Sequence, residues 1–344
     1  MRYLLIDSAN MFFRARHVAS KGTDTWGKLG LAIQITMLSV NKGWRDHNAD
    51  HVIFCLDGRR GWRRDEYAPY KLNRKVDRSL QTDEEIEEHE MFMETYEQFN
   101  EFLRNDTNCT VLENEVAEAD DLIARWIQTH PDDDHTIVSS DTDFIQMISS
   151  NVDLFDGVRG LTYTPDGVTN ENGKRVEFTV DSYGKVKIGD KNPDFVPEKD
   201  WIERALFLKI MRGDKSDNVF SAFPGVRVKG SVKKPGLNEA FADRIQQGYN
   251  WNNIMHSKWM DHNDEEHRVL DDYKRNKSLI DLTEQPAHIK EEIDKSLVIT
   301  DKRISMVGVK FLQFCGKYQL NRLSEDADII TKWLSAPSPE MVIC

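Results

Sequence analysis

Three short apolar runs that each lead into an aspartate constrain the fold of this chain more than any other feature. They are residues 3–6 before Asp7, residues 52–56 before Asp57, and residues 136–138 shortly before Asp141. Continuous apolar runs of this length, bounded by polar residues, are typical of strands buried on both faces. Between them, residues 29–40 and 91–103 carry apolar residues at helical spacing. The alternation predicts an α/β fold with a parallel sheet, and the three aspartates are expected to converge at its carboxyl edge.

The 344 residues allow about two domains. We expect residues 1–196 to form the α/β domain, with a β-hairpin excursion in the Gly-, Asn-, Asp- and Pro-rich stretch 156–195. Residues 197–334 carry helical patterns at 201–211, 239–247, 265–279 and 310–320 and are expected to form a helical region. Residues 335–344 are expected to be a frayed tail.

Six further carboxylates stand in short motifs that allow them to share a face. Asp143 follows Asp141 by two positions, Glu118, Asp120 and Asp121 form one motif, and Asp214 and Asp217 form another. Residues two apart in an extended chain point the same way, and residues three apart share a helical face. Asp120 or Asp121 can also lie near a helix start, where a carboxylate is favoured.

Nine ionised carboxylates cannot be brought together without cations, because their repulsion would raise their pKa values and destabilise the fold. Oxygen ligands without His or Cys select Mg²⁺ or Mn²⁺. Two such ions about 4 Å apart can activate a water and stabilise the leaving oxygen of a phosphodiester. Each motif alone has an ordinary structural interpretation, as a turn or a helix cap. Their combination predicts a two-metal site.

The net charge of −13 alone argues against a nucleic-acid partner, but without these nine carboxylates the chain is nearly balanced. Residues 59–78 are rich in Lys and Arg, with Trp62, Tyr67 and Tyr70 interleaved. Most charge runs are solvated faces, but dispersed cations with aromatics also suit phosphate contacts and base stacking. The candidate contact residues here and in the basic stretch 225–236 are Arg63, Arg64, Lys75, Arg227, Lys229, Lys233 and Lys234.

Membrane and secretory classes are disfavoured. No run approaches eighteen apolar residues, and the first residues lack the apolar core of a signal peptide. The four cysteines form no CxxC pair and no metal-ligand spacing. A cytoplasmic protein with reduced thiols is expected.

Five motifs together resemble the 5′-nuclease superfamily, which includes flap endonucleases and the 5′→3′ exonuclease domains of bacterial DNA polymerases. They are LLIDSANMFFRAR, CLDGRRGWRRDEYAPYKLNR, EVAEADDLIA, VSSDTDFIQM and GDKSDNV, in the family's order. The sequence is most similar to the phage branch that contains the T-even-phage ribonuclease H. The resemblance implies a PIN-like parallel α/β sheet, a basic helical arch at 59–105 and a C-terminal helix-three-turn-helix DNA module.

The resemblance also implies roles for individual residues. Asp7, Asp57, Glu118, Asp120 and Asp141 match ligands of a first metal ion, with Asp121 assisting. Asp143, Asp214 and Asp217 match ligands of a second, more loosely held ion. Lys71 matches the arch lysine that contacts the scissile phosphate, Arg74 is expected to help there, and Tyr70 to stack on a base. Arg14 matches a basic position near the substrate, and Arg16 of the same motif is a further candidate for nucleic-acid binding.

One segment departs from the family pattern. The family's Gly-rich turn, which binds duplex phosphates and often a potassium ion, survives here only as Pro224-Gly-Val226. The basic residues from Arg227 to Lys234 are expected to grip the duplex instead, and the sequence leaves a potassium site undetermined.

The leading hypothesis is a phage-type, metal-dependent hydrolase with two Mg²⁺ ions, for which Mn²⁺ can substitute. It would act as a 5′→3′ exonuclease, flap endonuclease and ribonuclease H that removes RNA primers during DNA replication. Its expected partners are DNA and RNA–DNA duplexes with 5′ ends or flaps, and it is expected to be a monomer in the host cytoplasm.

A nucleic-acid-binding scaffold with an inactive site is the alternative. An aspartyl phosphatase would need a DxDx[TV] motif, which Asp7 does not begin. The sequence leaves open the balance between exonuclease and flap cutting, the RNA or DNA preference, and whether a clamp or single-strand-binding protein is a partner.

Overall fold

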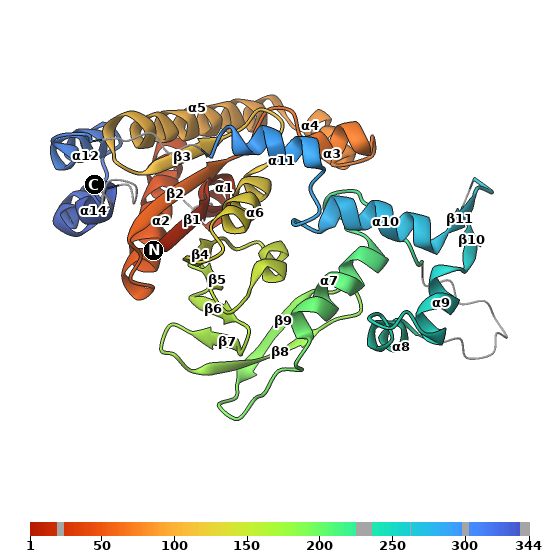
Figure 1. Cartoon of the computed structure of the whole chain (residues 1–344). Coiled ribbons are helices and arrows are strands. Elements are labelled where there is room, and N and C mark those ends of the chain that lie inside the picture. Colours follow the sequence, from red (N-terminus) through yellow and green to blue (C-terminus); the bar gives the residue numbers. More distant parts are fainter. Residues whose placement is uncertain (19–23, 225–235, 262, 298–302, 338–344) are drawn as a thin grey trace. The chain divides into compact units, whose positions relative to one another are not determined.

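The computed structural model describes the chain except residues 19–23, 225–235, 262, 298–302 and 338–344 (Figure 1). It divides into two compact units. The first comprises residues 1–62, 79–174 and 287–344, and the second comprises residues 63–78 and 175–286. These breaks do not coincide with the predicted division at residue 196, and most of the predicted tail lies outside the described residues.

The first unit is built on strands in the order β3-β2-β1-β4-β5-β6-β7. Their bounds are β1 Arg2–Asp7, β2 His51–Leu56, β3 Thr110–Glu113, β4 Asp134–Val138, β5 Val152–Asp156, β6 Leu161–Thr164 and β7 Gly167–Asn170. The pairs from β3 through β5 are parallel, and β6 and β7 extend the sheet antiparallel. The predicted α/β class with a mainly parallel sheet and C-terminal helices is confirmed.

Helices of the first unit cover the sheet. They are α1 Ser8–Val18, α2 Thr25–Asp46, α5 Asp83–Asp106, α6 Ala119–Thr129, the 3₁₀ helix η1 Thr142–Met147, α11 Ala287–Asp294, α12 Val307–Lys317, α13 Asn321–Glu325 and α14 Ala327–Leu334. Leu4 and Ile6 of β1 pack into a core shared with α2, α5, α12 and α14. Tyr3 meets Trp126 of α6 edge to face. Successive β1 side chains therefore point to opposite layers, as expected of a strand buried on both faces.

The second unit contains the hairpin β8 (Arg175–Val180) and β9 (Val186–Lys191), and a set of helices. Its other elements are most of α3 (Trp62–Glu66), α4 Leu72–Ser79, α7 Trp201–Arg212, α8 Leu237–Ala242, α9 Tyr249–Met255, β10 Lys258–Met260, β11 Glu266–Arg268 and α10 Val269–Ile280. Phe207, Leu208 and Met211 of α7 pack against α8, α9 and the start of α10. Among the described residues, no helix combines the length and apolarity needed to cross a membrane.

Candidate active site

Three aspartates from neighbouring strands meet at the carboxyl edge of the first unit's sheet. Asp7 is the last residue of β1, Asp57 directly follows β2, and Asp141 lies three residues after β4. Since β1 pairs in parallel with both β2 and β4, the three strands end at the same edge. Burial, together with the charges of Asp57 and Asp141, raises the pKa of Asp7 to about 7. The structure thus brings the three carboxylates close enough to repel one another.

Ser139 connects two of these aspartates. Its Oγ donates a hydrogen bond to Asp7 Oδ2 at 2.9 Å and accepts one from the backbone N–H of Asp141 at 3.0 Å. The backbone N–H of Asn10, in the first turn of α1, donates to Asp7 Oδ1 at 3.3 Å. These donors partly oppose the rise in the pKa of Asp7 because they favour its charged form.

Asp57 is held against the start of α6. Its Oδ1 accepts a hydrogen bond from the backbone N–H of Ala119 at 2.9 Å, next to Glu118 at the helix N-cap. Gly58 donates its N–H to the carbonyl of Ala117 at 2.8 Å. A Cβ on Gly58 would lie 2.0 Å from the carbonyl oxygen of Asn114, so only glycine fits there. This close approach fixes Asp57 and Glu118 beside each other.

Asp121 differs from the other carboxylates of its motif because it is fully buried. Its Oδ2 accepts hydrogen bonds from the indole N–H of Trp62 at 3.0 Å and from the backbone N–H of Glu118 at 3.1 Å. Asp120, one residue earlier, accepts from the backbone N–H of Asp121 at 2.8 Å. Asp121 therefore anchors the helix start, and Asp120 and Glu118 lie nearer to solvent.

Asp141 also begins η1, since its Oδ1 accepts a hydrogen bond from the backbone N–H of Asp143 at 2.9 Å. Arg14 of α1 approaches the same loop, with its Nη1 3.5 Å from the carbonyl oxygen of Ser140. Oxygen donors thus surround this edge, but among the described residues they form no set of three whose ligand atoms all lie within 4.8 Å. The donor set fits a hard divalent cation, which would offset both the burial of the Asp7 charge and its repulsion from Asp57 and Asp141, the causes that raise the pKa of Asp7.

The structure places Asp214 and Asp217 in the second unit, where each contacts a cation. Lys209 Nζ lies 2.7 Å from Asp214 Oδ2, and the backbone N–H of Ser216 donates to Oδ1 at 2.7 Å. Burial raises the pKa of Asp214, but Lys209 and the hydrogen bonds outweigh it and lower the pKa to about 2. Arg74 Nη2 contacts Asp217 Oδ1 at 2.7 Å.

Tyr70, Lys71 and Arg74 gather around Asp217 within the second unit. The Tyr70 hydroxyl donates to Asp217 Oδ2 at 3.2 Å, and the backbone N–H of Lys71 donates to the Asp217 carbonyl at 2.8 Å. Tyr70 is only 3% exposed and packs against Ile210 and Leu279. In this conformation its ring lies in a core, although the sequence predicted that it stacks on a base. Lys71 has a φ of 53° just before α4, and its Nζ lies 4.9 Å from the centre of the Tyr70 ring.

The other predicted contact residues have different environments. Arg63 is buried, and its Nε donates to the Leu279 carbonyl at 2.8 Å, whereas Arg64 is exposed. The side chains of Arg16 and Lys75 are not among those described. Arg227, Lys229, Lys233 and Lys234 lie outside the described residues.

Two supporting residues were not identified from the sequence. Ser139 precedes Asp141 in the same Ser-rich motif, and a hydroxyl beside a predicted metal-ligand motif was the available signal. Lys209 lies on α7, five residues before Asp214, and nothing in the local sequence distinguishes it from a solvated lysine. Its contact with Asp214 depends on how the chain turns after α7.

Comparison with known proteins agrees with this architecture. The family model of the 5′-3′ exonuclease N-terminal, resolvase-like domain matches residues 2–173. A DNA polymerase I of Rhizobium leguminosarum is 28% identical over 256 residues, which are 70% of this chain and 20% of the polymerase. The chain therefore matches about a fifth of that relative's length.

Solved structures of a bacteriophage T5 protein share the fold. The T5 D15 protein co-crystallised with metal ions has a TM-score of 0.53 at 16% identity, over 96% of this chain and 99% of that one. A complex of the T5 D15 flap endonuclease with DNA and metal ions has a TM-score of 0.54 at 16% identity, over 96% and 100% of the two chains. At this identity the likeness shows the fold alone. Because the family model covers half of its residues, and Asp7, Asp57 and Asp141 of the predicted motifs lie at the predicted sheet edge, the chain belongs to the 5′-3′ exonuclease family of 5′-nucleases.

Proposed function

We propose that this protein is a metal-dependent 5′-nuclease that hydrolyses phosphodiester bonds at 5′ ends and flaps of DNA or RNA-primed duplex. The observation that supports this most strongly is the convergence of Asp7, Asp57 and Asp141 at the sheet edge, where burial, together with the charges of Asp57 and Asp141, raises the pKa of Asp7 to about 7. A purely structural or binding role would not require three like charges at one place. The cost of holding them together is offset when a cation binds.

The proposed ligands of the first ion are Asp7, Asp57, Glu118, Asp120 and Asp141. Two Mg²⁺ ions, or Mn²⁺ in their place, would supply an activated water and stabilise the leaving oxygen. Ser139 would hold Asp7 and the backbone of Asp141 in position to bind the ion, because its hydroxyl is hydrogen-bonded to both. Asp121 is proposed to fix the position of Glu118, because its buried carboxylate accepts hydrogen bonds from the Trp62 indole and the Glu118 backbone N–H.

In the second unit we propose that Lys71 and Arg74 act on the substrate phosphate. The left-handed backbone of Lys71 is uncommon for a residue with a side chain, and such strain often accompanies function. Asp217 positions this segment through Arg74, Tyr70 and the Lys71 N–H. Asp214 and Asp217 would have to exchange Lys209 and Arg74 for a metal ion before they could act as ligands.

Arg14 and Arg64 are proposed phosphate contacts, and Arg63 is not, because it is buried. We further propose that the biological substrate is the RNA-primed lagging strand of a phage, cleaved in the host cytoplasm. That substrate combines a 5′ end, a duplex and a flap, which are the features this family recognises.

Product mapping on 5′-labelled flap, nicked and RNA-primed duplexes tests the proposal. With Mg²⁺ we expect short 5′ oligonucleotides, and in excess chelator we expect none. Asp57→Asn should abolish cleavage, whereas Asp166→Asn, at an exposed turn, should cleave like the unaltered protein. Cleavage by Asp57→Asn at an unchanged rate, or in excess chelator after extensive dialysis, would contradict the metal-dependent mechanism.

A further inference from the structure

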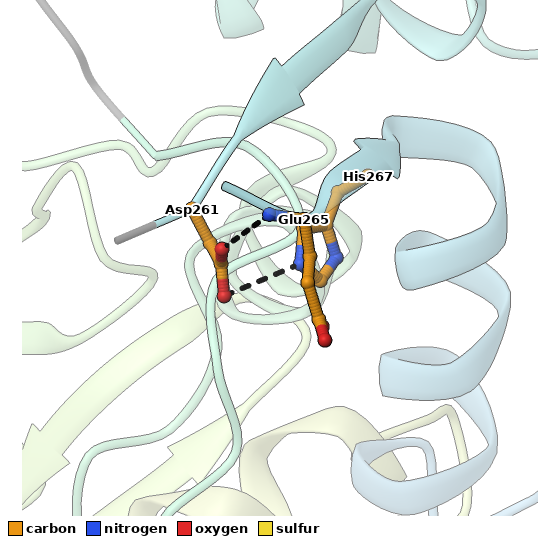
Figure 2. Close-up of side chains that lie close together, drawn as sticks. All are labelled: Asp261, Glu265 and His267. Atoms are coloured by element: carbon orange, nitrogen blue, oxygen red, sulfur yellow. Dashed lines mark hydrogen bonds and ion pairs between the residues drawn. The ribbon is translucent and has the colours of Figure 1, made fainter. Parts of the chain in front are cut away.

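The hairpin of β10 and β11 in the second unit holds a cluster that the proposed nuclease chemistry does not use. Asp261, Glu265 and His267 each offer one ligand atom, and these atoms all lie within 4.8 Å of one another (Figure 2). Among the residues that the structure describes, this is the one set of three His, Cys, Asp or Glu side chains with that geometry. It contains an imidazole, so it differs in chemistry from the all-carboxylate edge of the first unit.

Asp261 is fixed by the turn between the two strands. Its Oδ1 accepts hydrogen bonds from the backbone N–H groups of Asn263 at 2.8 Å and Glu265 at 2.9 Å. Its Oδ2 faces the ring of His267, with Nε2 3.8 Å away, and also lies 3.3 Å from Asn263 Nδ2. The separation of 3.8 Å between Oδ2 and Nε2 is too long for a hydrogen bond.

His267 is held on its other side. Its ring stacks on Trp259 with a centroid distance of 4.3 Å and an angle of 14°, and its Nδ1 lies 3.2 Å from Asp272 Oδ2. The Nε2 atom is buried and has no hydrogen-bond partner among the described residues. A buried ring nitrogen without such a partner costs free energy unless a ligand occupies it. It points toward the carboxylate of Asp261 (Figure 2).

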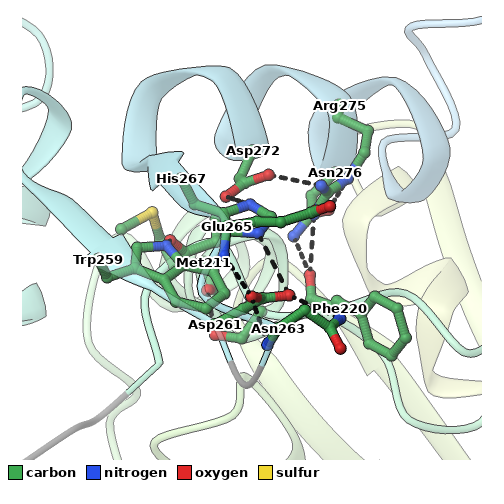
Figure 3. Close-up of polar contacts among 12 residues, drawn as sticks. Met211, Phe220, Trp259, Asp261, Asn263, Glu265, His267, Asp272, Arg275 and Asn276 are labelled. Carbon is green, nitrogen blue, oxygen red and sulfur yellow. Dashed lines mark hydrogen bonds and ion pairs between the residues drawn. The ribbon is translucent and has the colours of Figure 1, made fainter.

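Asp272 places a buried carboxylate beside the ring of His267, although its Oδ2 accepts no hydrogen bond among the described residues. Its side chain is only 8% exposed, and Arg275 Nη1 donates to its Oδ1 (Figure 3). Arg275 in turn donates through Nε to Asn276 Oδ1 at 3.1 Å. The negative charge of Asp272, 3.2 Å from Nδ1, favours the tautomer that carries its proton on Nδ1 and leaves the Nε2 lone pair for a metal.

We propose that Asp261, Glu265 and His267 bind a first-row divalent metal ion of the Zn²⁺ or Mn²⁺ class, with Asp272 as the positioning residue. Metal–nitrogen and metal–oxygen bonds of about 2.0–2.2 Å place neighbouring tetrahedral ligands about 3.4 Å apart, so the observed 3.8 Å needs only a small closure. Mg²⁺ prefers oxygen ligands, so this ion would not be the one held at the sheet edge. Asp272 belongs to α10, so the ion would fasten the hairpin to that helix.

Calorimetric titration of the full chain with Zn²⁺, in excess Mg²⁺, tests this site. Mg²⁺ occupies hard oxygen sites, and any Zn²⁺ that still binds at them is common to all variants. The unaltered protein should bind one more Zn²⁺ than His267→Gln. Asp272→Asn should raise the Zn²⁺ Kd about 10- to 100-fold, because it removes the residue that orients the ring.

Two further variants serve as controls, one for misfolding of the hairpin and one for non-specific binding of Zn²⁺ to histidine. Glu265→Gln changes an exposed side chain, so the hairpin should stay folded while the Kd rises at least tenfold. His256→Gln removes a histidine that contacts Arg268 at 2.7 Å instead of the cluster, and it should bind Zn²⁺ like the unaltered protein. Equal stoichiometry and equal Kd for the unaltered protein, His267→Gln and Glu265→Gln would overturn the proposal. The cluster would then be a histidine held between two carboxylates.

Discussion

The acidic edge of the first unit and the acidic pair of the second unit carry the same side chains in opposite electrostatic environments. At the edge, burial and then the charges of Asp57 and Asp141 raise the pKa of Asp7 to about 7. In the second unit Lys209 neutralises Asp214, and the pKa of that carboxyl falls to about 2. At the edge a bound cation would therefore lower the pKa of Asp7, whereas Lys209 already lowers the pKa of Asp214 within the second unit. Aspartates at predicted metal positions are thus not equivalent before a metal binds.

The largest expected effect comes from neutralising Asp7. Asp7→Asn removes a carboxylate that we propose as a metal ligand, so cleavage should fall to background. The same change should stabilise the metal-free protein, because it relieves repulsion at the edge. Single-turnover cleavage and the Tm in chelator measure the two effects.

Asp214→Asn is the matched control for that prediction. It removes the buried negative charge that Lys209 Nζ contacts at 2.7 Å, so the metal-free protein should lose stability instead of gaining it. A fall in Tm for both variants would contradict the difference we infer between the two regions.

Lys71 gives the next largest effect. Its charge is proposed to stabilise the transition state more than the bound substrate, so Lys71→Met should lower the single-turnover rate about 10²- to 10³-fold and leave flap binding within a few-fold. The backbone bond from Lys71 to Asp217 survives the substitution. Lys75→Met, one helical turn later, should lose far less. Equal, small losses for both lysines would mean that the segment only attracts DNA.

The pH dependence of stability separates the two regions with opposite signs. The pKa of Asp7 is raised in the folded state from 3.8 to about 7, so the metal-free protein should lose stability as pH rises from about 4 to 7. The pKa of Asp214 is lowered from 3.8 to about 2, so its contribution is present above pH 4 and is lost as pH falls toward 2. Urea unfolding in chelator should show the first slope disappear in Asp7→Asn and the second in Asp214→Asn. Saturating Mg²⁺ should flatten only the first.

Much of the first unit could be predicted because its signals are local. The apolar runs before Asp7, Asp57 and Asp141 correspond to β1, β2 and β4, and parallel pairing explains why their ends meet. The division into units could not be predicted. The chain returns to the first unit after residue 286 through long-range contacts: Arg125 of α6 binds Asp294 of α11 at 2.6 Å, and α12 and α14 pack into the core of the first unit.

Within the second unit, local patterns were less reliable. The helical pattern expected at 265–279 begins only at Val269, because residues 266–268 pair with β10. Arg63 and Arg64 are indistinguishable in the sequence, yet Arg63 packs inside and donates to Leu279, far along the chain. The burial of Tyr70 against Ile210 has the same origin. Such contacts join residues that are far apart in the sequence, so the composition of the local segment does not predict them.

The smallest expected effect on stability tests whether Arg74 acts on the substrate or only holds Asp217. Their contact is at 2.7 Å, but the Arg74 side chain is 52% exposed, and exposed ion pairs contribute about 0–1 kcal/mol. Arg74→Gln should therefore change the free energy of unfolding by less than about 1 kcal/mol, since Tyr70 still donates to Asp217. If Arg74 contacts the scissile phosphate, single-turnover cleavage should nevertheless fall by at least tenfold.

Arg204→Gln, which breaks a contact with Glu198 elsewhere in the second unit, should change neither the free energy of unfolding nor the cleavage rate appreciably. Equal cleavage rates in Arg74→Gln and Arg204→Gln would mean that Arg74 only binds Asp217 and does not act on the substrate. Lys71 would then be the only cation of the second unit that we propose to act in catalysis.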